Sequence, residues 1–581
     1  MMKKFILEHK EFLIGLGLTL SLLWPLFASG YFSHHDNVQV IRLYEMDKCF
    51  KDFQIPCRWV PDLGMLYGYP MFNFYAPLAY YYGEVVYKIL GGVIENGFIV
   101  SAKVMFATSF VFSYIFMFLL GRKLWGEKGG ALSAIFFSFA PYHAVLIFVR
   151  GAMGELWGVM FYPAIFWALL KLREKISILN LLLLAVFSAG LILSHNLSSM
   201  IFFPILLGFT IVLLITKKQE LQILKGRFLI FFAAALILAA GLSSFYWIPL
   251  MTEKNLVHVE TTTSGYFSYT EHFKGLKKLF LDPYWGWGAS VREVPGGEKD
   301  GISYQIGWVH LLGWALSLYA FIKLRKDRPT LAKTIIFSSF IIWLSIFMIN
   351  PRSEPLWKLI DPLKYLQFPW RLLGLIIFFI SLASGSILTV INKKYINFLW
   401  VGLVLLVVAL NFFYFRPEKF FNINDKYFFT AEEWDRQLKR SVFDFLPIYA
   451  KEPPALLAPA RYEILTGETQ VLDIQEGTNW FNFKTDTKSH TIIRLSQYYF
   501  PNWQIKVDGK IVKIDYENNL GLMTIILGQG HHFVEGRLYD TQQRIIGNKL
   551  TVISAVLFVL LGLSQIQKVR RWLLYYLRRI N

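Results

Sequence analysis

The sequence contains few residues that could form a metal centre or a familiar phosphate-binding loop. Cysteine occurs only at Cys49 and Cys57, and no second ligand pair accompanies them, so a structural zinc site built on this pair is not expected. The chain also lacks a Walker loop, a G-x-G-x-x-G turn after a strand, a serine nucleophile elbow and an H-E-x-x-H motif. These absences argue against P-loop enzymes, dinucleotide-dependent enzymes, elbow-type serine hydrolases and zincins.

Charged residues are also scarce, at 17% of the chain, and few of them lie inside the apolar segments. A transporter driven by protons or sodium usually carries ionisable residues near the middle of its helices. Their scarcity disfavours such a transporter without removing it as an alternative.

Hydrophobic residues, in contrast, make up 55% of the 581 positions, and the mean hydropathy is +0.43. A helix needs about 20 mostly apolar residues to cross a bilayer. This predicts a polytopic α-helical membrane protein of about twelve spans, at 12–29, 98–120, 130–149, 155–170, 178–194, 197–215, 228–250, 306–323, 333–349, 371–391, 397–415 and 549–566. The first is interpreted as a retained helix rather than a cleaved signal. The stretch 77–94 carries Glu84 and Lys88 in its middle, so we expect an interfacial or re-entrant helix there.

The positions of lysine and arginine predict the orientation, because cytoplasmic loops are enriched in both. With twelve spans, every basic cluster falls on the side of the N-terminus: Lys3/Lys4/Lys10, Arg122/Lys123/Lys128, Lys171/Arg173/Lys175, Lys217/Lys218/Lys225/Arg227, Lys323/Arg325/Lys326/Arg328, Lys393/Lys394 and Lys568/Arg570/Arg571/Arg578/Arg579. We therefore predict a plasma-membrane protein with both termini in the cytoplasm. The net charge of +19 follows from this topology, and no nucleic-acid partner is expected.

The same count leaves four long segments outside: 30–97, 251–305, 350–370 and 416–548. Both cysteines lie in the first of them, where they either pair in an oxidising compartment or remain two thiols. Short basic loops inside and long aromatic loops outside indicate that the chemistry takes place at the external face.

The last external segment changes its pattern between 461 and 539, where apolar and polar residues alternate. Alternating runs at 491–496, 503–507 and 523–527 are bounded by turn residues, and Asp508-Gly509 is a favourable hairpin turn. This predicts a small external β-sandwich. Its aromatic residues either stack on sugar rings or fill the sandwich core: Trp480, Tyr498, Tyr499, Phe500 and Trp503.

The first external loop opens with a carboxylate flanked by imidazoles: His34, His35 and Asp36. Polar groups at the mouth of a helix bundle are candidates for function. Alternatively, Asp36 caps the helix-like run 38–50 that follows it. The residues alone favour neither interpretation.

Other polar residues are predicted at the external ends of spans: Arg150, Glu155, His195 and Arg371. Arginine is unusual there under the positive-inside rule, and its planar fork matches phosphate oxygens. The two arginines therefore suggest binding of a lipid phosphate or diphosphate. The alternatives are a salt bridge, for example between Arg150 and Glu155, and snorkelling to lipid headgroups.

Several motifs together carry a family resemblance. The first loop at 33–81 (SHHDN to APLAYY), PYHAVLIFVRGAMGELW at 141–157, SHN at 194–196 and LQFPWRLLG at 366–374 resemble the bacterial membrane family labelled 6-pyruvoyl-tetrahydropterin synthase-related. YYFPNWQIKVDGK at 498–510 and GQGHHFV at 528–534 resemble the external domain of YfhO-like membrane proteins. Both groups are similar to the GT-C superfamily of glycosyltransferases. The pterin synthase activity in the label finds no support in the residues.

The resemblance implies a GT-C-like transmembrane domain at 1–415, a mostly β external domain at 416–548, and a last helix with a basic tail at 549–581. It further implies sugar transfer from a polyprenyl-phosphate donor to an envelope glycan or lipid acceptor. Asp36 stands where such enzymes carry their base, with His34, His35, Arg150, Glu155, His195 and Arg371 as substrate-binding candidates. A divalent metal is possible but not indicated, because the family's acidic pair separated by one residue is missing. The rivals are a flippase or transporter of lipid-linked substrates and a non-catalytic envelope-assembly protein.

Overall fold

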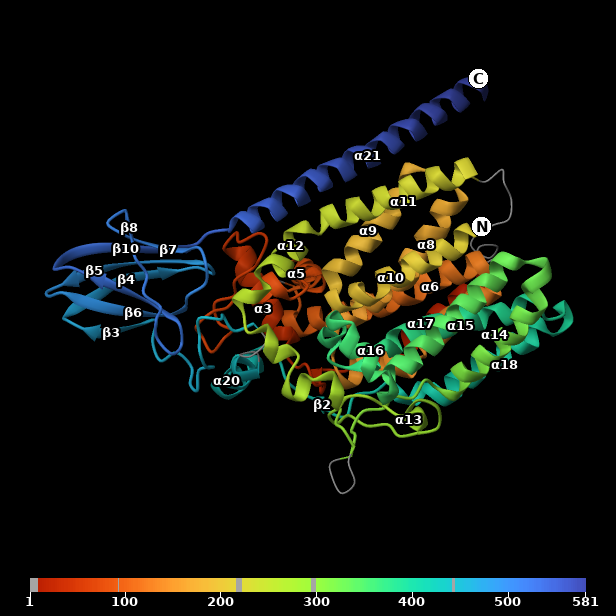
Figure 1. Ribbon diagram of the computed structural model, residues 1–581, viewed down its shortest axis with the longest axis horizontal. Coiled ribbons are helices and arrows are strands. Elements are labelled where there is room, and N and C mark those ends of the chain that lie inside the picture. The colour runs from red at the N-terminus through yellow and green to blue at the C-terminus, as the bar shows by residue number, and fades with distance from the viewer. Residues whose placement is uncertain (1–8, 92, 216–221, 294–298, 441–444, 581) are drawn as a thin grey trace.

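The computed structural model describes residues 9–91, 93–215, 222–293, 299–440 and 445–580. Figure 1 shows a helical body with a stack of β-strands at one end. The last helix, α21 (Gln542–Ile580), runs from the strands back along the helical body, so its far end lies opposite the strands (Figure 1). Some basic residues used to predict the orientation, Lys3, Lys4, Lys217 and Lys218, lie outside the described residues.

Within the described chain, eight helices are long and apolar enough to cross a membrane. They comprise α6 (Gly97–Ser138), α8 (Met153–Glu174), α10 (Asn196–Leu214), α11 (Gln222–Leu242), α15 (Pro329–Ile349), α17 (Leu373–Ser384) with its flanking turns, α18 (Lys393–Asn411) and α21. A shorter apolar helix, α9 (Ile178–Ser194), stands between α8 and α10. The chain therefore has the helices of a multi-pass membrane protein, while twelve spans stay a prediction.

Two predicted spans take a different form in the structure, and a third is a single helix. The span at 12–29 becomes α2 (Lys10–Ser21) followed by a 3₁₀ turn, and 306–323 corresponds to α14 (Trp308–Asp327). The span at 130–149 forms the second half of α6, beyond a non-helical Gly126, but α6 ends at Ser138. The reason is Pro141, which disfavours helical geometry at the preceding residue: Ala140 is extended, with φ −64° and ψ 133°. A short α7 (Pro141–Ala144) and a π-helical turn (Val145–Val149) complete this segment.

The first loop is a folded unit of three helices, α3 (Gln39–Lys51), α4 (Met71–Phe74) and α5 (Leu78–Leu90). The helix predicted at 38–50 is confirmed as α3. Cys49 and Cys57 form a disulfide, which decides the question that the sequence left open. The loop is thereby tied to α3.

The helix α5, in the segment predicted to be interfacial, buries the carboxylate of Glu84 completely. Lys88 Nζ lies 3.3 Å from Glu84 Oε1 and 2.6 Å from Asp47 Oδ1. Burial, together with the nearby Asp47 carboxylate, raises the pKa of Glu84 to about 7, while Lys88 acts in the opposite direction. With 13 residues, α5 is not among the eight helices long and apolar enough to cross a membrane.

The C-terminal strands form two antiparallel sheets, which Figure 1 shows stacked on each other. One has the order β4-β5-β10-β7-β8 and the other β3-β6-β9. The strands are β3 (Tyr462–Thr466), β4 (Thr469–Glu476), β5 (Trp480–Thr487), β6 (Thr491–Tyr498), β7 (Trp503–Val507), β8 (Lys510–Val512), β9 (Leu522–Leu527) and β10 (Gly530–Leu538). The three predicted strands coincide with β6, β7 and β9. Asp508 and Gly509, with φ of 50° and 79°, form the predicted hairpin turn between β7 and β8.

The strands of the two sheets begin at β3, close to 461, where the alternating pattern was predicted to start. Residues 416–461 contain α19 (Asp425–Phe428), α20 (Ala431–Arg440) and β2 (Phe420–Phe421). β2 pairs with β1 (Tyr31–Phe32), which precedes the histidines of the first loop. The remaining short helices are α12 (Ser244–Glu253), α13 (Leu276–Phe280) and α16 (Glu354–Leu359).

A buried polar network joins the last helix to the helical body. Glu253 at the end of α12 accepts hydrogen bonds from Arg544 Nε and Asn73 Nδ2, both at 2.9 Å. Arg58 of the first loop donates to Asn73 Oδ1 at 3.1 Å and to Asn548 Oδ1 at 2.8 Å. These contacts fix the first loop, α12 and the start of α21 relative to one another.

Candidate functional site

The start of the first loop pairs with the turn between α7 and α8. The backbone N–H groups of His35 and Asp36 donate to the carbonyls of Val149 and Arg150, each at 2.9 Å. Gly151 completes the turn with φ of 64°, and an added Cβ there would lie 2.2 Å from His34 Nδ1. Glycine is therefore required at this position, both for the left-handed backbone and for the close approach of the loop.

Arg150 follows the π-helical turn, a distortion that often marks functional sites. Arg150 Nη1 donates to Glu155 Oε2 at 2.6 Å and lies 3.3 Å from the hydroxyl of Tyr142. Tyr142 donates to the other oxygen of Glu155. The guanidinium also lies over the ring of Trp370, 4.8 Å from its centroid.

Arg371 approaches the same carboxylate from a different part of the chain. Its Nε lies 3.3 Å from Glu155 Oε2, while its Nη1 donates to the Leu366 carbonyl and the Gln367 side chain, both at 2.9 Å. The exposed side-chain fraction is 13% for Arg371, 8% for Arg150 and 4% for Glu155. The salt bridge considered from the sequence therefore forms, but Glu155 is shared between two arginines.

The guanidinium groups of Arg150 and Arg371 share the buried carboxylate of Glu155, so these three side chains together carry one net positive charge. The carboxylate of Asp36, which is exposed, acts electrostatically on both guanidinium groups. Asp36 does not cap α3, whose N-cap residue is Val38 and has no side-chain cap bond. An exposed carboxylate thus lies beside a buried cationic pair.

His195 also belongs to this cluster, since its ring interacts with the charges of Glu155, Arg371 and Arg150. It caps α10, and its Nδ1 accepts from the Ser198 N–H at 3.2 Å. Burial lowers the pKa of His195 to about 3, so the ring is neutral at pH 7. With Nδ1 as acceptor, the hydrogen-bond network assigns the proton to Nε2, which makes that nitrogen a donor.

The two histidines of the first loop are placed differently. His34 packs among the rings of Tyr31, Phe32 and Phe106, and its Nε2 lies 3.3 Å from the Tyr31 hydroxyl. His35 is exposed, and its Nε2 lies 2.8 Å from the Trp287 carbonyl. The predicted substrate-binding roles of His34 and His35 stay predictions.

The segment 251–305 covers this region. Trp287 contacts His35 through its carbonyl, and Ser290 Oγ accepts from Trp370 Nε1 at 3.0 Å. Inside the segment, the buried Lys274 pairs with Asp300. The segment therefore holds Trp370 in position against Arg150.

Sequence reasoning did not single out three residues that shape the cluster: Tyr142, Gln367 and Trp370. Tyr142 bridges Glu155 and Arg150, Gln367 holds Arg371, and Trp370 stacks on Arg150. All three occur inside the motifs PYHAVLIFVRGAMGELW and LQFPWRLLG. Their presence in the same motifs as the predicted arginines was the sequence signal that could have identified them.

The donor set does not favour a divalent ion. No group of three or more His, Cys, Asp or Glu side chains that could hold a metal occurs in the part of the chain that the structure describes. Both oxygens of Glu155 are engaged by Arg150, Arg371 and Tyr142. Asp36 is then the single carboxylate of the cluster that is open to a ligand.

Comparison with known proteins gives partial similarities. No family model matches the chain. An uncharacterized protein of Lactococcus lactis subsp. cremoris (strain MG1363) is 24% identical over 217 residues, which are 37% of this chain and 35% of the relative. The chain thus matches about a third of the length of that relative. The resemblance to the pterin-synthase-related and YfhO-like families stays a prediction.

Among solved structures, the chain is similar to the Archaeoglobus fulgidus oligosaccharyltransferase tethered with an acceptor peptide, with 12% identity and a TM-score of 0.47 over 74% of this chain and 59% of that one. The oligosaccharyltransferase AglB of the same organism, in complex with an inhibitory peptide and a dolichol-phosphate, is 12% identical, with a TM-score of 0.46 over 71% of this chain and 55% of that one. The arabinofuranosyltransferase AftD from Mycobacteria is 13% identical, with a TM-score of 0.45 over 74% of this chain and 28% of that one. In each case the chain spans less than two thirds of the solved protein.

Proposed function

We propose that this protein is a GT-C-type membrane glycosyltransferase that moves a sugar from a polyprenyl-phosphate donor to a cell-envelope acceptor on the external face. The observation that carries the proposal is the exposed carboxylate of Asp36 beside the buried pair Arg150 and Arg371. Inverting sugar transfer from a lipid phosphate needs these two functions, a base for the acceptor and a cation for the leaving group.

The leaving group is the lipid phosphate, whose negative charge grows as the bond to the sugar breaks. Arg371 and Arg150 share one carboxylate, so they retain positive charge for phosphate oxygens. Because they are buried and held by Gln367 and Trp370, they need little rearrangement when the charge develops. Neutral His195 supplies a further donor from Nε2.

The acceptor hydroxyl attacks the anomeric carbon from the face opposite the phosphate. A bond forms between the acceptor oxygen and that carbon while the bond to the phosphate oxygen breaks, and the phosphate leaves with the electron pair. Asp36 removes the hydroxyl proton as general base. A single displacement inverts the anomeric centre.

In this proposal the cluster lies at the external membrane face, with twelve spans, both termini in the cytoplasm and the protein in the plasma membrane. Support comes from the eight long apolar helices and from the basic loops on the side of the N-terminus. We assign 1–415 to the transferase domain, 416–548 to an external domain and 549–581 to the last span and tail.

The test uses the purified protein in proteoliposomes with polyprenyl-phosphate sugar and an envelope glycan acceptor. Asp36→Asn should reduce transfer by about 10²–10⁴-fold, the typical contribution of a general base. Asp361→Asn, at an exposed carboxylate in the external segment 350–370, is the matched control and should transfer at the wild-type rate. Wild-type transfer by Asp36→Asn would refute the assignment. Movement of lipid-linked sugar across the bilayer without transfer would instead support a flippase.

Arg371→Lys tests the leaving-group role, because it retains the charge but loses the guanidinium fork. We expect transfer to fall by about 10²-fold, in line with the loss of one preorganised donor. Lys364→Arg, a change at an exposed cation of the same external segment, should have no effect. Equal activity of Arg371→Lys and wild type would show that the fork does not contact the phosphate.

A further inference from the structure

The outer face of the five-stranded sheet carries a group of side chains that the proposed transfer reaction does not use. Along β5, β10 and β7, alternate residues point to opposite faces. Phe483, Val534 and Ile505 are buried between the sheets, so their neighbours along each strand face outward. The outward-facing residues are Trp480, Asn482, Gln504, Lys506, Glu535 and Arg537.

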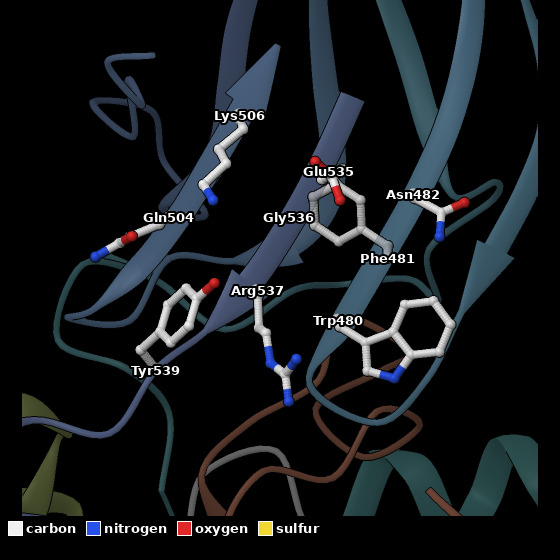
Figure 2. A pocket seen from close by; sticks show the side chains of 9 residues that line it. All are labelled: Trp480, Phe481, Asn482, Gln504, Lys506, Glu535, Gly536, Arg537 and Tyr539. Atoms are coloured by element: carbon white, nitrogen blue, oxygen red, sulfur yellow. The ribbon is translucent and has the colours of Figure 1, made fainter. Parts of the chain in front are cut away.

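The strand register arranges these six residues in two parallel rows. Glu535 of β10 pairs with Asn482 on one side and Lys506 on the other. Arg537 pairs with Trp480 and Gln504 in the same way. Tyr539 follows at the end of β10. Figure 2 shows Trp480 and Tyr539 on opposite sides of Arg537, with Glu535 above it. These residues line a cleft with a volume of about 150 Å³.

The structure separates the aromatic residues for which the sequence left two roles open. Tyr498, Phe500 and Trp503 are buried, with exposed fractions of 1%, 0% and 4%, so they serve as core. Trp480, by contrast, is partly exposed and lines the cleft. It is the aromatic residue of that set placed to meet a ligand here.

Trp480 is held in place by the first loop. Its Nε1 donates to Asp52 Oδ1 at 2.8 Å, and Asp52 Oδ2 accepts from the Thr478 N–H at 2.7 Å. Asp52 follows α3 in the first loop. The polar edge of the indole is therefore satisfied, and the ring is fixed before any ligand arrives, which lowers the entropy lost on binding.

The polar side chains of the cleft are not engaged with one another. Within the described part of the chain, the side chains of Asn482, Gln504, Lys506 and Glu535 form no hydrogen bond or ion pair. Arg537 has a ring contact with Tyr539, 5.9 Å from the centroid. Amide, carboxylate and guanidinium groups can each bond two adjacent hydroxyls, as donors, acceptors or both. Their hydrogen-bond donor and acceptor atoms are therefore available to a ligand in the cleft.

This combination of groups selects one class of ligand. An apolar ligand would leave the polar groups of the lining unpaired, which is costly. A phosphate backbone would meet the carboxylate of Glu535 between the two cations. A saccharide ring has vicinal hydroxyls for the amides and charged groups, and apolar C–H faces for Trp480 and Tyr539. The small volume suits one ring rather than an extended chain.

We propose that this cleft is a saccharide-binding site that engages one sugar unit of an envelope glycan. Its identification as the docking site of the acceptor rests on the proposed function, whereas saccharide binding itself does not. A glycan held by the external sheets would be kept near the membrane-bound site, because Asp52 connects the cleft with the first loop that carries Asp36. Binding in the cleft would raise the local concentration of the acceptor near the membrane-bound site, with no new contact at the reacting atoms.

The experiment measures binding to the full-length protein in nanodiscs by saturation-transfer NMR and calorimetry. The probes are maltohexaose, chitohexaose and hexagalacturonate, which separate neutral, N-acetylated and acidic sugars, with inorganic phosphate as a fourth. We expect at least one oligosaccharide to bind. Glu535→Gln combined with Arg537→Ala should weaken that binding at least tenfold. Lys484→Ala, an exposed change on the neighbouring strand β5 but outside the cleft, should leave it unchanged.

Three outcomes overturn the proposal: no binding of any oligosaccharide at millimolar concentration, binding that the double variant does not weaken, or binding of inorganic phosphate alone. Asp36→Asn should bind the oligosaccharide like the wild type. Saccharide binding without any transfer activity would therefore refute the proposed function and leave this site standing. Loss of binding in the cleft variant with normal folding, judged by circular dichroism, assigns the effect to the cleft.

Discussion

Replacing Glu155 by glutamine tests whether one carboxylate neutralises both buried arginines. Glu155 Oε2 lies 2.6 Å from Arg150 Nη1 and 3.3 Å from Arg371 Nε, and the three side chains are no more than 13% exposed. Glutamine keeps one acceptor oxygen but removes the charge, so two guanidinium groups remain buried without a buried counter-ion. Breaking a buried ion pair costs about 3–5 kcal/mol. Because one acceptor survives, we expect a loss of about 3 kcal/mol in the free energy of unfolding.

The assay is equilibrium unfolding in mixed micelles, with Glu517→Gln as the control, since that carboxylate is exposed and forms no ion pair in the described chain. Adding Arg150→Gln to Glu155→Gln removes one of the unpaired cations. The free energy of unfolding of the double variant should therefore be about 1 kcal/mol or more above that of Glu155→Gln alone. A coupling energy of this size is within the usual range for neighbouring residues. A loss below about 1 kcal/mol for Glu155→Gln, or no recovery in the double variant, would refute the shared-carboxylate reasoning.

Two further predictions concern the first loop. Replacing Cys49 and Cys57 together by serine should lower the free energy of unfolding by about 2–3 kcal/mol, because the disulfide closes a loop with a sequence separation of 8. Treating the wild type with a reductant should give a similar loss, and an unchanged stability would contradict the prediction. For Glu84, the folded pKa of about 7 lies above the ordinary value of 4.5, so the folded state binds more protons between these values. Stability should fall as pH rises from about 4.5 to 7 and then level off, and Glu84→Gln should flatten this part of the stability profile. An identical slope in the variant would show that another group titrates.

The strands and the first-loop helix could be predicted because their signals are local. Alternation at 491–496 and 503–507 and the Asp508-Gly509 turn are properties of a few adjacent residues, and the structure has β6, β7 and their turn at these places. Helix ends were less predictable. The span expected at 130–149 stops at Ser138, because Pro141 terminates α6 although the apolar composition continues.

Several of the predicted site residues lie together in the structure, but their contacts were not predictable from the sequence. Counting helices placed Asp36, Arg150, Glu155, His195 and Arg371 at one face, and the structure brings their charges within mutual influence. No local pattern indicated that Arg371 and Arg150 share one carboxylate. That contact depends on how α8 and the turn before α17 meet in space.

By itself, the sequence determined that the chain forms long apolar helices, that its basic residues cluster in short loops, and that a strand-rich segment precedes the last helix. These are consequences of hydrophobicity and periodicity, which each segment carries within its own residues. The tertiary structure alone decided which arginines share Glu155, that Asp36 is exposed instead of capping α3, and which aromatic residues fill the core. It also decided that Trp480 lines a polar cleft. Such features depend on strand register and on contacts between residues hundreds of positions apart, such as Asp52 and Trp480, which no local pattern encodes.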